Sequence, residues 1–338
     1  GNTTTGTQST TTITFDETLP TAFTVGAVIT TGGTVVAGQW NPSNTGIDIT
    51  VPLANDASLT SGTLQIRANV AGGGFVNLGS AHTILVGELN ANKTLSFNAA
   101  TFEGLTIANL EVTTFTAIIT DNASNATTGT QSTTTISFDE TLPTAFTVGS
   151  VITTGGTVVA NYWNASNTGI DITVPLDNDA SLTGGTLQIR ANVASGGYED
   201  LGSAHTILVA EISANKTLSF NAATFEALSG GLSNLEALSF TATITDKAGN
   251  TTTGTQSTTT ITFDETPPVA FTVGSVITTG GTVVAGQWTP TNTSIDITVP
   301  LDNDATLTDG TLQIMASVDG DPYENLGTAH TILVGELN

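Results

Sequence analysis

Cysteine is absent from the 338 residues, and basic residues are scarce. Without cysteine the chain has no disulfide, no thiolate metal site and no cysteine nucleophile. Five Lys and Arg against 29 Asp and Glu give a formal charge of -24, so a basic stripe that neutralises phosphates cannot form. We therefore expect no nucleic-acid partner, and we expect cations to be the natural partners of this chain.

Long apolar runs are also missing. No run approaches the roughly 20 residues that span a bilayer, and no basic start with an apolar core marks a signal peptide. We expect no membrane insertion in this segment, and a secretion signal, if the protein has one, would lie outside it. The chain is nevertheless 38% apolar, which favours a folded acidic protein because enough apolar surface remains to offset chain entropy.

Three landmarks recur in one order along the chain and define an internal repeat. They are a phenylalanine before an acidic pair, a tryptophan and a histidine: Phe15, Phe138 and Phe263; Trp40, Trp163 and Trp288; His82, His205 and His330. The first and second members of each set are 123 residues apart, and the second and third are 125 apart. The two extra residues enter between Phe225 and Leu235, where a tolerated insertion indicates a surface connection.

The chain neither begins nor ends in phase with this repeat, so we expect a stretch cut from a longer array. Gly1 aligns with Gly249, late in one repeat, and Asn338 aligns with Asn90, well inside another. The predicted organisation is the final strand of a preceding repeat, two whole repeats and one incomplete repeat, at residues 1–16, 17–139, 140–264 and 265–338.

The local pattern within a repeat predicts β-structure throughout. Segments such as GIDITVPL, GTLQIRANV and SFTATIT alternate apolar and polar residues and are bounded by Gly, Asn, Asp and Pro. Only Thr224 to Leu238 could hold a helical turn, and its glycine pair argues against a long helix. The chain is thus predicted to form tandem antiparallel β-sandwiches of immunoglobulin type arranged end to end. The recurring tryptophans, with Phe23, Phe146 and Phe271, are expected in the cores, and sugar stacking by the tryptophans is a minor alternative.

Two longer stretches carry a resemblance to a known family. FDETLPTAFTVGSVITTGGTVV and TATITDKAGNTTTGTQSTTTITFDETPP resemble the tandem bacterial immunoglobulin-like repeats of large surface adhesins. Those arrays join domains through an acidic D-x-T-x-P linker and carry a D-x-A-G-N loop before the last strand. The resemblance covers the whole chain, and it rests on the linker, the loop and the period together. The chain departs from the pattern at Ser124, which replaces the loop glycine, and at Leu19 and Leu142, where the third copy has Pro267.

The resemblance implies an extracellular or bacterial cell-surface protein whose repeats form a stalk. It implies that neighbouring repeats of the array are partners of one another, and that calcium often stiffens their junctions. Because the chain departs from the pattern at Ser124 and Leu142, the resemblance does not imply that calcium occupies every junction.

A length argument assigns ligands to the expected junction sites. Thr251 to Phe263 reads as one closing strand, and 13 residues at roughly 3.3 Å each span about 40 Å, so its ends lie at opposite poles of a domain. The loop before this strand then faces the linker that enters the domain. Calcium takes six to eight oxygen ligands, and we predict two sites, one made by Asp139, Glu140, Asp246 and Asn250 and one by Asp16, Glu17, Asp121 and Asn125. The alternative is that these side chains only cap their own turns.

A second acidic pair follows each VPL segment. Its Asp-x-Asp spacing can place two carboxylates on one cation, but Ala54 removes one of them from the first copy. We interpret these pairs as turns and keep a metal role as the lesser alternative for Asp177, Asp179, Asp302 and Asp304.

Catalysis is the weaker interpretation, and we expect no enzyme. Each repeat has one histidine, and a lone histidine in a strand is more often structural than catalytic. Glu103 with Glu111, or Glu226 with Glu236, could be imagined as a glycosidase pair, but nothing in the sequence builds a sugar cleft around them.

Two non-catalytic classes stay open, a structural spacer and a multivalent array that binds glycans or other surfaces. The sequence varies most around Phe75, Tyr198 and Tyr323, where an exposed aromatic is the place to seek ligand contact. Donation of residues 1–16 to another copy of the chain would build a filament by β-augmentation. It would leave the region aligned with residues 91–121 unsupplied, so truncation is the simpler account.

Overall fold

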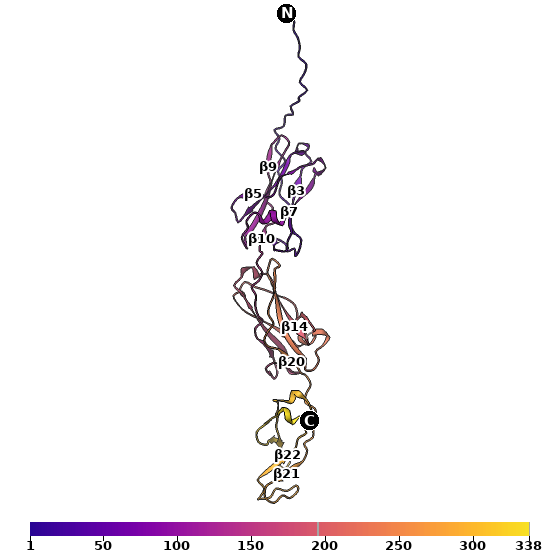
Figure 1. Cartoon of the computed structure of the whole chain (residues 1–338), viewed down its shortest axis with the longest axis vertical. Helices are drawn as coiled ribbons and strands as arrows, with labels where there is room; N and C mark the ends of the chain where they lie inside the picture. Colours follow the sequence, from indigo (N-terminus) through magenta and orange to yellow (C-terminus); the bar gives the residue numbers. More distant parts are fainter. Residues whose placement is uncertain (195, 338) are drawn as a thin grey trace. The chain divides into compact units, whose positions relative to one another are not determined.

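The protein folds almost entirely into β-structure, as the sequence predicts. Its structure is a computed structural model that describes residues 1–194 and 196–337. The chain divides into two compact units, Gly1–Asp264 and Glu265–Asn338. The first unit contains two β-sandwiches of the same topology, so the predicted fold of tandem immunoglobulin-like sandwiches is confirmed (Figure 1). In the part of the chain that the structure describes, no helix has the length and hydropathy of a membrane span.

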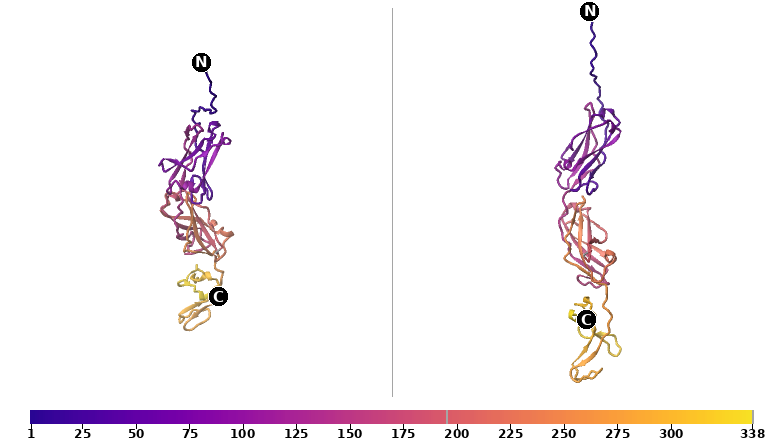
Figure 2. Two further views of the ribbon diagram at one scale, coloured as in Figure 1. Left: turned by 45° about the horizontal axis from the view of Figure 1, so that its top comes forward. Right: turned by 45° about the vertical axis from the view of Figure 1, so that its right-hand side comes forward.

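Two facing sheets make the first sandwich (Figure 2). The smaller sheet has the strand order β1-β3-β7, and the larger has β2-β10-β8-β4-β5, with β6 added to β4 and β9 added to β8. Their ladders are antiparallel except that β10 pairs with β2 in parallel. The strands are β1 (Val28–Thr31), β2 (Gln39–Trp40), β3 (Gly46–Leu53), β4 (Thr63–Val70), β5 (Phe75–Asn77), β6 (His82–Thr83), β7 (Ala91–Asn98), β8 (Val112–Thr120), β9 (Ala126–Thr128) and β10 (Ile136–Phe138).

The second sandwich repeats this topology strand for strand. Its sheets have the orders β11-β13-β17 and β12-β20-β18-β14-β15, with β16 on β14 and β19 on β18. The strands are β11 (Val151–Thr154), β12 (Tyr162–Trp163), β13 (Gly169–Leu176), β14 (Thr186–Val193), β15 (Tyr198–Asp200), β16 (His205–Thr206), β17 (Ala214–Asn221), β18 (Ala237–Thr245), β19 (Thr251–Thr253) and β20 (Ile261–Phe263).

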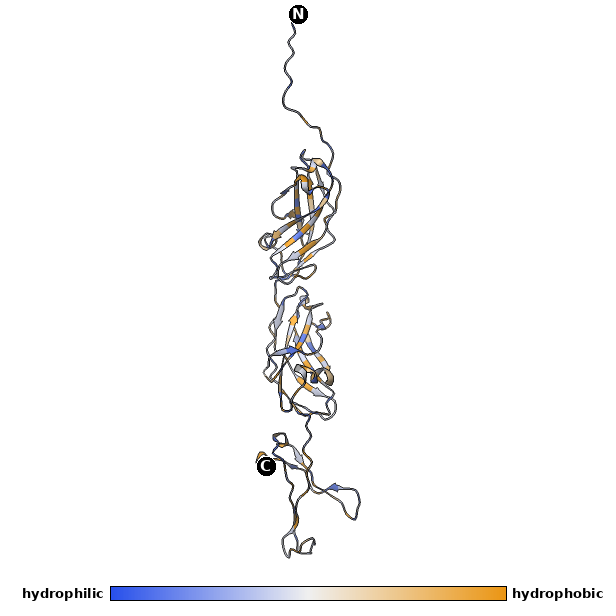
Figure 3. Cartoon of the chain, turned by 90° about the vertical axis from the view of Figure 1, so that its right-hand side faces the viewer, coloured by the Kyte–Doolittle hydropathy of each residue, from blue (hydrophilic) through white to orange (hydrophobic). Residues whose placement is uncertain are grey.

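The alternating segment GIDITVPL forms β3 and β13, and every second side chain enters the core. Figure 3 shows hydrophobic and hydrophilic colours mixed along the strands of both sandwiches. In β3 the buried residues are Ile47, Ile49, Val51 and Leu53. Pro52 cannot donate a backbone hydrogen bond, but β1 pairs with β3 only as far as Ile49. The missing N–H of Pro52 therefore removes no hydrogen bond from the pairing of β3 with β1.

An aromatic cluster fills the centre of each sandwich. In the first sandwich, helix α1 (Ala99–Glu103) begins at Asn98, whose side chain caps Thr101, and it buries Phe102 between the sheets. The Phe102 ring lies 4.7 Å from Trp40 and 6.2 Å from Phe115, measured between centroids. Burying each ring contributes about 2–3 kcal/mol relative to leaving it exposed. Trp40 and Trp163 are core residues, as the sequence predicts, because both are fully buried.

The predicted helical turn is present in the second sandwich. Helix α2 (Ala222–Glu226) is followed by the short helix η4 (Leu228–Gly230) and by β18. The insertion is not wholly a surface connection, since Leu228 packs into the core. The remaining short helices of the two sandwiches are η1 (Ala57–Leu59), η2 (Val86–Glu88) and η3 (Ala180–Leu182).

The threonine-rich closing segment is not the single strand that the sequence suggests. β19 pairs with the end of β18 and β20 pairs with its beginning, so the two ends of the segment do lie far apart along β18. Between them Thr255 leaves β18 and forms a bridge with Thr147, and Ser257 N–H then returns to the Phe240 carbonyl. Gly254 permits this change of partner, because a Cβ there would lie 2.3 Å from the Phe146 ring.

Residues 1–15 carry the same threonine-rich sequence but form no strand, and nearly all of their side chains are exposed. Their sequence is that of the predicted final strand of a repeat. In the part of the chain that the structure describes, however, no strand pairs with them.

The unit Glu265–Asn338 has three two-stranded sheets, and among residues 265–337 no strand corresponds to β8 or β18. Its Trp288 is 60% exposed for this reason, so the core prediction fails for this tryptophan. The elements are β21 (Val276–Thr279), β22 (Ser294–Ile297), η5 (Ala305–Leu307), β23 (Thr311–Leu312), β24 (Met315–Ala316), β25 (Glu324–Asn325), β26 (His330–Thr331) and η6 (Val334–Glu336).

Candidate cation site at the linker

The linker from Asp139 to Pro143 is bonded to the sandwiches on both sides. Asp139 N–H donates to the Trp40 carbonyl over 2.9 Å. Asn250 Nδ2 donates to the carbonyl oxygens of Asp139 and Thr141 over 3.1 and 3.3 Å. Thr252 Oγ1 donates to the Pro143 carbonyl over 2.6 Å. The linker is thus held by Asn250 and by β19 of the sandwich that it enters.

The loop from Asp246 to Asn250 is closed by its own side chains. Asp246 Oδ1 accepts hydrogen bonds from the N–H groups of Ala248 and Asn250, and its Oδ2 accepts one from Asn250 Nδ2. This is the turn-capping arrangement that the sequence left as an alternative. Burial raises the pKa of Asp246 above its usual range, although these hydrogen bonds oppose the increase.

Asp139 carries a buried carboxylate oxygen without a partner. The residue is 1% exposed, and its Oδ1 accepts a hydrogen bond from Thr141 N–H. Its Oδ2 accepts no hydrogen bond in the described structure. Burial raises the pKa of Asp139, and the carboxylates of Asp246 and Asp179 raise it further, while hydrogen bonding from Thr141 N–H and from the Asn109 side chain opposes the increase. No basic side chain among the described residues forms an ion pair with these three carboxylates.

The convergence is therefore close to the predicted site but not identical to it. Hydrogen bonds join Asn250 to Asp139 and to Asp246, which brings these three predicted residues to one place. Asp179, which the sequence offered only as a lesser candidate, is near enough to raise the pKa of Asp139. Glu140 lies elsewhere, since its Oε1 accepts a hydrogen bond from Trp40 Nε1 over 3.2 Å. Burial raises the pKa of Glu103, and the adjacent Glu140 raises it further. Asp139 and Glu140 thus have different partners, Thr141 N–H and Trp40 Nε1.

The donor chemistry suits a hard divalent cation. Carboxylates are the ligand type that calcium prefers, and backbone carbonyls or water complete six to eight ligands. Asn250 turns its Nδ2, a hydrogen-bond donor, toward Asp139, Thr141 and Asp246, so it holds the linker and the loop together and does not present an oxygen. Among the described residues, no three His, Cys, Asp or Glu side chains already lie in a metal-binding geometry. A cation would have to draw the carboxylates of Asp139, Asp179 and Asp246 closer together.

The equivalent residues of the first repeat are less enclosed. Asp121 is buried and caps its own loop, while Asn125 Nδ2 donates to the Asp16 carbonyl over 3.2 Å. Asp16 Oδ1 accepts from Thr18 N–H, and Glu17 is exposed. Asp16, Asp121 and Asn125 thus lie near one another, and Glu17 is not brought to them by any contact.

The second acidic pairs act as turn residues, as expected. Asp179 and Asp304 accept hydrogen bonds at the starts of η3 and η5. Asp177 and Asp302 accept from the following asparagine N–H groups, and the Thr144 hydroxyl together with Asn178 N–H lowers the pKa of Asp177. Asp179 also lies near enough to Asp139 to raise the pKa of that residue.

Each histidine bonds a glutamate whose carboxylate also closes a turn. His82 Nε2 and Lys93 Nζ lie 2.8 and 2.5 Å from the two carboxylate oxygens of Glu88, and Leu85 N–H donates to the same group over 3.0 Å. Burial would raise the pKa of Glu88, but these partners outweigh it and lower the pKa to about 2. His205, Glu211 and Lys216 repeat the arrangement. These contacts give the histidines a structural role.

The glutamates considered for catalysis also have structural partners. Glu111 Oε2 accepts from Ala108 N–H and Glu236 Oε2 accepts from Ser233 N–H, each closing a turn. Glu103 lies beside Glu140 and Trp40.

The variable aromatic residues differ in setting. The Arg67 guanidinium lies 6.0 Å from the Phe75 ring centroid, and Tyr198 Oη donates to Gln256 Oε1 over 2.6 Å. Tyr323 is 69% exposed. Glycan contact at these positions stays a prediction.

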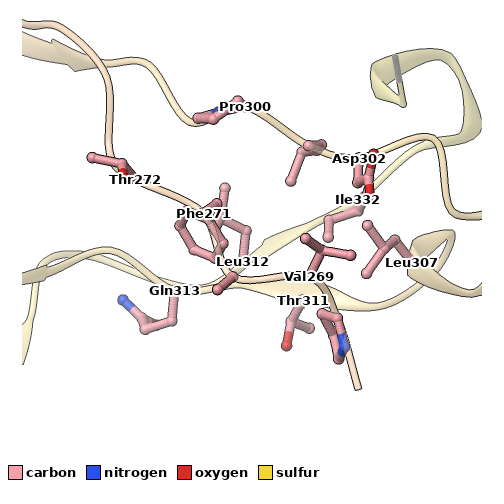
Figure 4. Close-up of a pocket in the computed structure, with 13 residues that line it drawn as sticks. Val269, Phe271, Thr272, Pro300, Asp302, Leu307, Thr311, Leu312, Gln313 and Ile332 are labelled. Atoms are coloured by element: carbon pink, nitrogen blue, oxygen red, sulfur yellow. The ribbon is translucent and has the colours of Figure 1, made fainter. Parts of the chain in front are cut away.

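A hollow of about 570 Å³ lies in the unit Glu265–Asn338 (Figure 4). Its lining is mainly apolar, with Val269, Phe271, Leu307 and Leu312 turned toward it. The corresponding hollows of the two complete sandwiches are smaller, about 170 and 330 Å³, and Ile119 of β8 or Ile244 of β18 lines them. The large hollow is thus an unclosed core and has no cluster of reactive groups.

Two residues of the linker region were not identified from the sequence. Asn109 faces the Asp139 carboxylate, and its recurrence in Asn-Leu-Glu at Asn234 was the available signal. Asn41 donates a hydrogen bond to the Ala248 carbonyl, more than 200 positions away in the sequence. No local pattern predicts this contact.

The fold and the linker geometry define a class, a tandem array of immunoglobulin-like β-sandwiches. No protein-family model and no curated protein matches the chain. A solved structure of the chicken CNTN1 FN1-FN3 domains is similar with 12% sequence identity and a TM-score of 0.29, over 73% of this chain and 68% of that one. A likeness at that TM-score supports no conclusion about function.

Proposed function

We propose that this chain is a spacer from an extracellular bacterial surface protein, in which tandem sandwiches form a stalk and a divalent cation stiffens their junction. The repeat, the acidic composition and the resemblance to adhesin repeats support the spacer. The protein acts by length and rigidity and catalyses no reaction.

The observation that carries the cation is the buried, unpartnered Oδ2 of Asp139 beside the carboxylates of Asp246 and Asp179. A buried charge without a partner destabilises a fold by several kcal/mol unless an opposite charge joins it. Calcium supplies that charge, and Asn250 holds the linker against the loop that would bind it. Calcium is the cation we propose because all the donors are oxygens.

The same interpretation extends to the first repeat. Asp16 and Asp121 would complete an equivalent site when a preceding sandwich covers them. Their present contact through Asn125 supports this extension.

Thermal unfolding of the full chain in calcium and in EDTA tests the proposal. Calcium at 100 times its dissociation constant should stabilise the site by about 2.7 kcal/mol and raise the Tm. Potassium chloride at matched ionic strength is the control, because general screening would then give the same shift. Equal melting temperatures in calcium, EDTA and potassium chloride would refute the cation.

A further inference from the structure

A second contact joins the two complete sandwiches, and it involves no ionisable group. Asn41, which follows β2, is 2% exposed. Its Nδ2 donates one hydrogen bond to the Thr34 carbonyl of its own sandwich and one to the Ala248 carbonyl of the next, both over 2.8 Å. Both hydrogens of the amide are therefore used, one on each side of the junction.

Hydrogen bonds within the first sandwich fix the position of the Asn41 side chain. Its N–H donates to Asn44 Oδ1 over 2.9 Å, and its Oδ1 accepts from Ser43 N–H and Oγ. Asn44 Nδ2 bonds the Gly32 and Thr34 carbonyls, so the loop that carries Thr34 is fixed as well. A donor fixed in this way loses little conformational entropy when it bonds the neighbouring sandwich.

The receiving loop is buried by this contact. Ala248 is fully buried, whereas its counterpart Ala123 is exposed. A Cβ added to Gly249 would lie 3.0 Å from Val36 Cγ2 and 3.2 Å from Thr34 Cγ2. Gly249 also has a φ of +91°, which disfavours any other residue. The loop glycine thus allows the two sandwiches to approach closely.

We infer that Asn41 and the Ala248-Gly249 loop form a latch between consecutive repeats that works without a cation. The latch pairs an amide on the exit side of one repeat, where the chain leaves for the next repeat, with a glycine in the loop of that next repeat. This latch deepens the proposed spacer function, since it sets the geometry of the junction while the cation site neutralises its charge.

The three copies differ at both halves of the pair. Thr289 replaces the amide in the third copy, and its one hydroxyl hydrogen is directed to the Thr282 carbonyl over 3.1 Å. Ser124 replaces the glycine in the first copy. A repeat with threonine on its exit side, or with serine in its loop, would therefore form a looser junction than the one between Asn41 and Gly249.

Distance measurements between spin labels test the latch on the full chain. The chain has no native cysteine, so Ser80→Cys and Ser203→Cys place one label at equivalent exposed positions of the two sandwiches. In calcium and in EDTA alike, Asn41→Ala and Gly249→Ala should each widen the distance distribution at least twofold.

The control is Asn164→Ala. Asn164 makes the same bonds to Thr157 and Ser166 inside the second sandwich and so reports the cost of a loosened loop. A distribution widened by Asn41→Ala and Gly249→Ala but not by Asn164→Ala supports the latch. Unchanged distributions in both variants, or equal widening by the control, overturn it. An effect of EDTA on the unmodified chain reports only on the cation, so the two proposals can fail separately.

Discussion

Asn250 Nδ2 donates a hydrogen bond over 3.1 Å to the main-chain oxygen of Asp139, 111 positions earlier in the sequence. This contact holds the linker against the loop that opens the closing segment of the second sandwich. It also brings the Asp139 carboxylate beside that of Asp246, which is an unfavourable arrangement without a cation. The junction is therefore sensitive to any change in charge.

Asp139→Asn should change stability in opposite directions with and without calcium. In EDTA at neutral pH the variant removes one of three neighbouring carboxylates, and we expect its free energy of unfolding to rise by about 1 kcal/mol. In saturating calcium it loses a ligand, and we expect the free energy to fall below that of the unmodified chain. Urea unfolding in the two buffers measures both values.

Asp16→Asn is the matched control for this prediction. Asp16 holds the same position in the first linker but is more exposed than Asp139. Its replacement should change the free energy of unfolding by less than about 0.5 kcal/mol. The same sign for Asp139→Asn in both buffers would show that its carboxylate binds no cation.

Gly254→Ala should destabilise the second sandwich. A Cβ at this position would lie 2.3 Å from Cε2 of the Phe146 ring, so either the ring or the closing segment must move. Overpacking of this kind costs about 1–3 kcal/mol. Chemical denaturation of the full chain should show the loss, and hydrogen exchange should place it at residues 251–263.

Gly6→Ala is its control, because Gly6 stands at the same position of the threonine-rich sequence in the N-terminal segment. No atom lies within 4 Å of a Cβ placed there. The control should leave stability unchanged. If Gly254→Ala were equally neutral, the break between β19 and β20 would not depend on glycine.

Glu88→Gln should lower stability at neutral pH and lose its effect in acid. The pKa of Glu88 in the folded protein is about 2, below the ordinary value of 4.5, so its ionised form stabilises the fold above about pH 4.5. That contribution is lost as the pH falls from about 4.5 to about 2. We expect a loss of roughly 1–2 kcal/mol at pH 7, which shrinks across this range. Urea unfolding at a series of pH values measures it.

Glu336→Gln is the comparison for the ionic cluster. Glu336 bonds His330 and Leu333 N–H but has no lysine partner among the described residues, and its side chain is 37% exposed. Its loss should be less than half that of Glu88→Gln. A difference between the unmodified chain and Glu88→Gln that stays constant with pH would contradict the ionic role.

Local pattern was sufficient for the strands and for most of the core. Alternation in GIDITVPL predicted which side chains of β3 enter the core, and the recurrence of Trp40 and Trp163 predicted their burial. The break at Gly254 was not predictable from alternation, because it depends on the Phe146 ring packed against the glycine. The exposure of Trp288 follows from missing partner strands, which a single residue cannot reveal.

The sequence alone also predicted half of the linker site. Recurrence of the acidic linker and the D-x-A-G-N loop, with the length of the closing segment, correctly placed Asp139 near Asp246 and Asn250. It did not separate Asp139 from Glu140, because the bond between Glu140 and Trp40 joins residues 100 positions apart in the sequence. The nearness of Asp179 to Asp139 also had no local signal, because Asp179 reads as the start of a short helix.

The sequence by itself determined the fold class, the repeat and the acidic character, because periodicity and composition are properties of neighbouring residues. Tertiary structure decided which carboxylates meet at the linker, where Asp139 loses its solvent, and which carbonyl Asn41 reaches. Those outcomes depend on how distant segments pack together, and the bond from Asn41 to Ala248, 207 positions away, has no local signal at all.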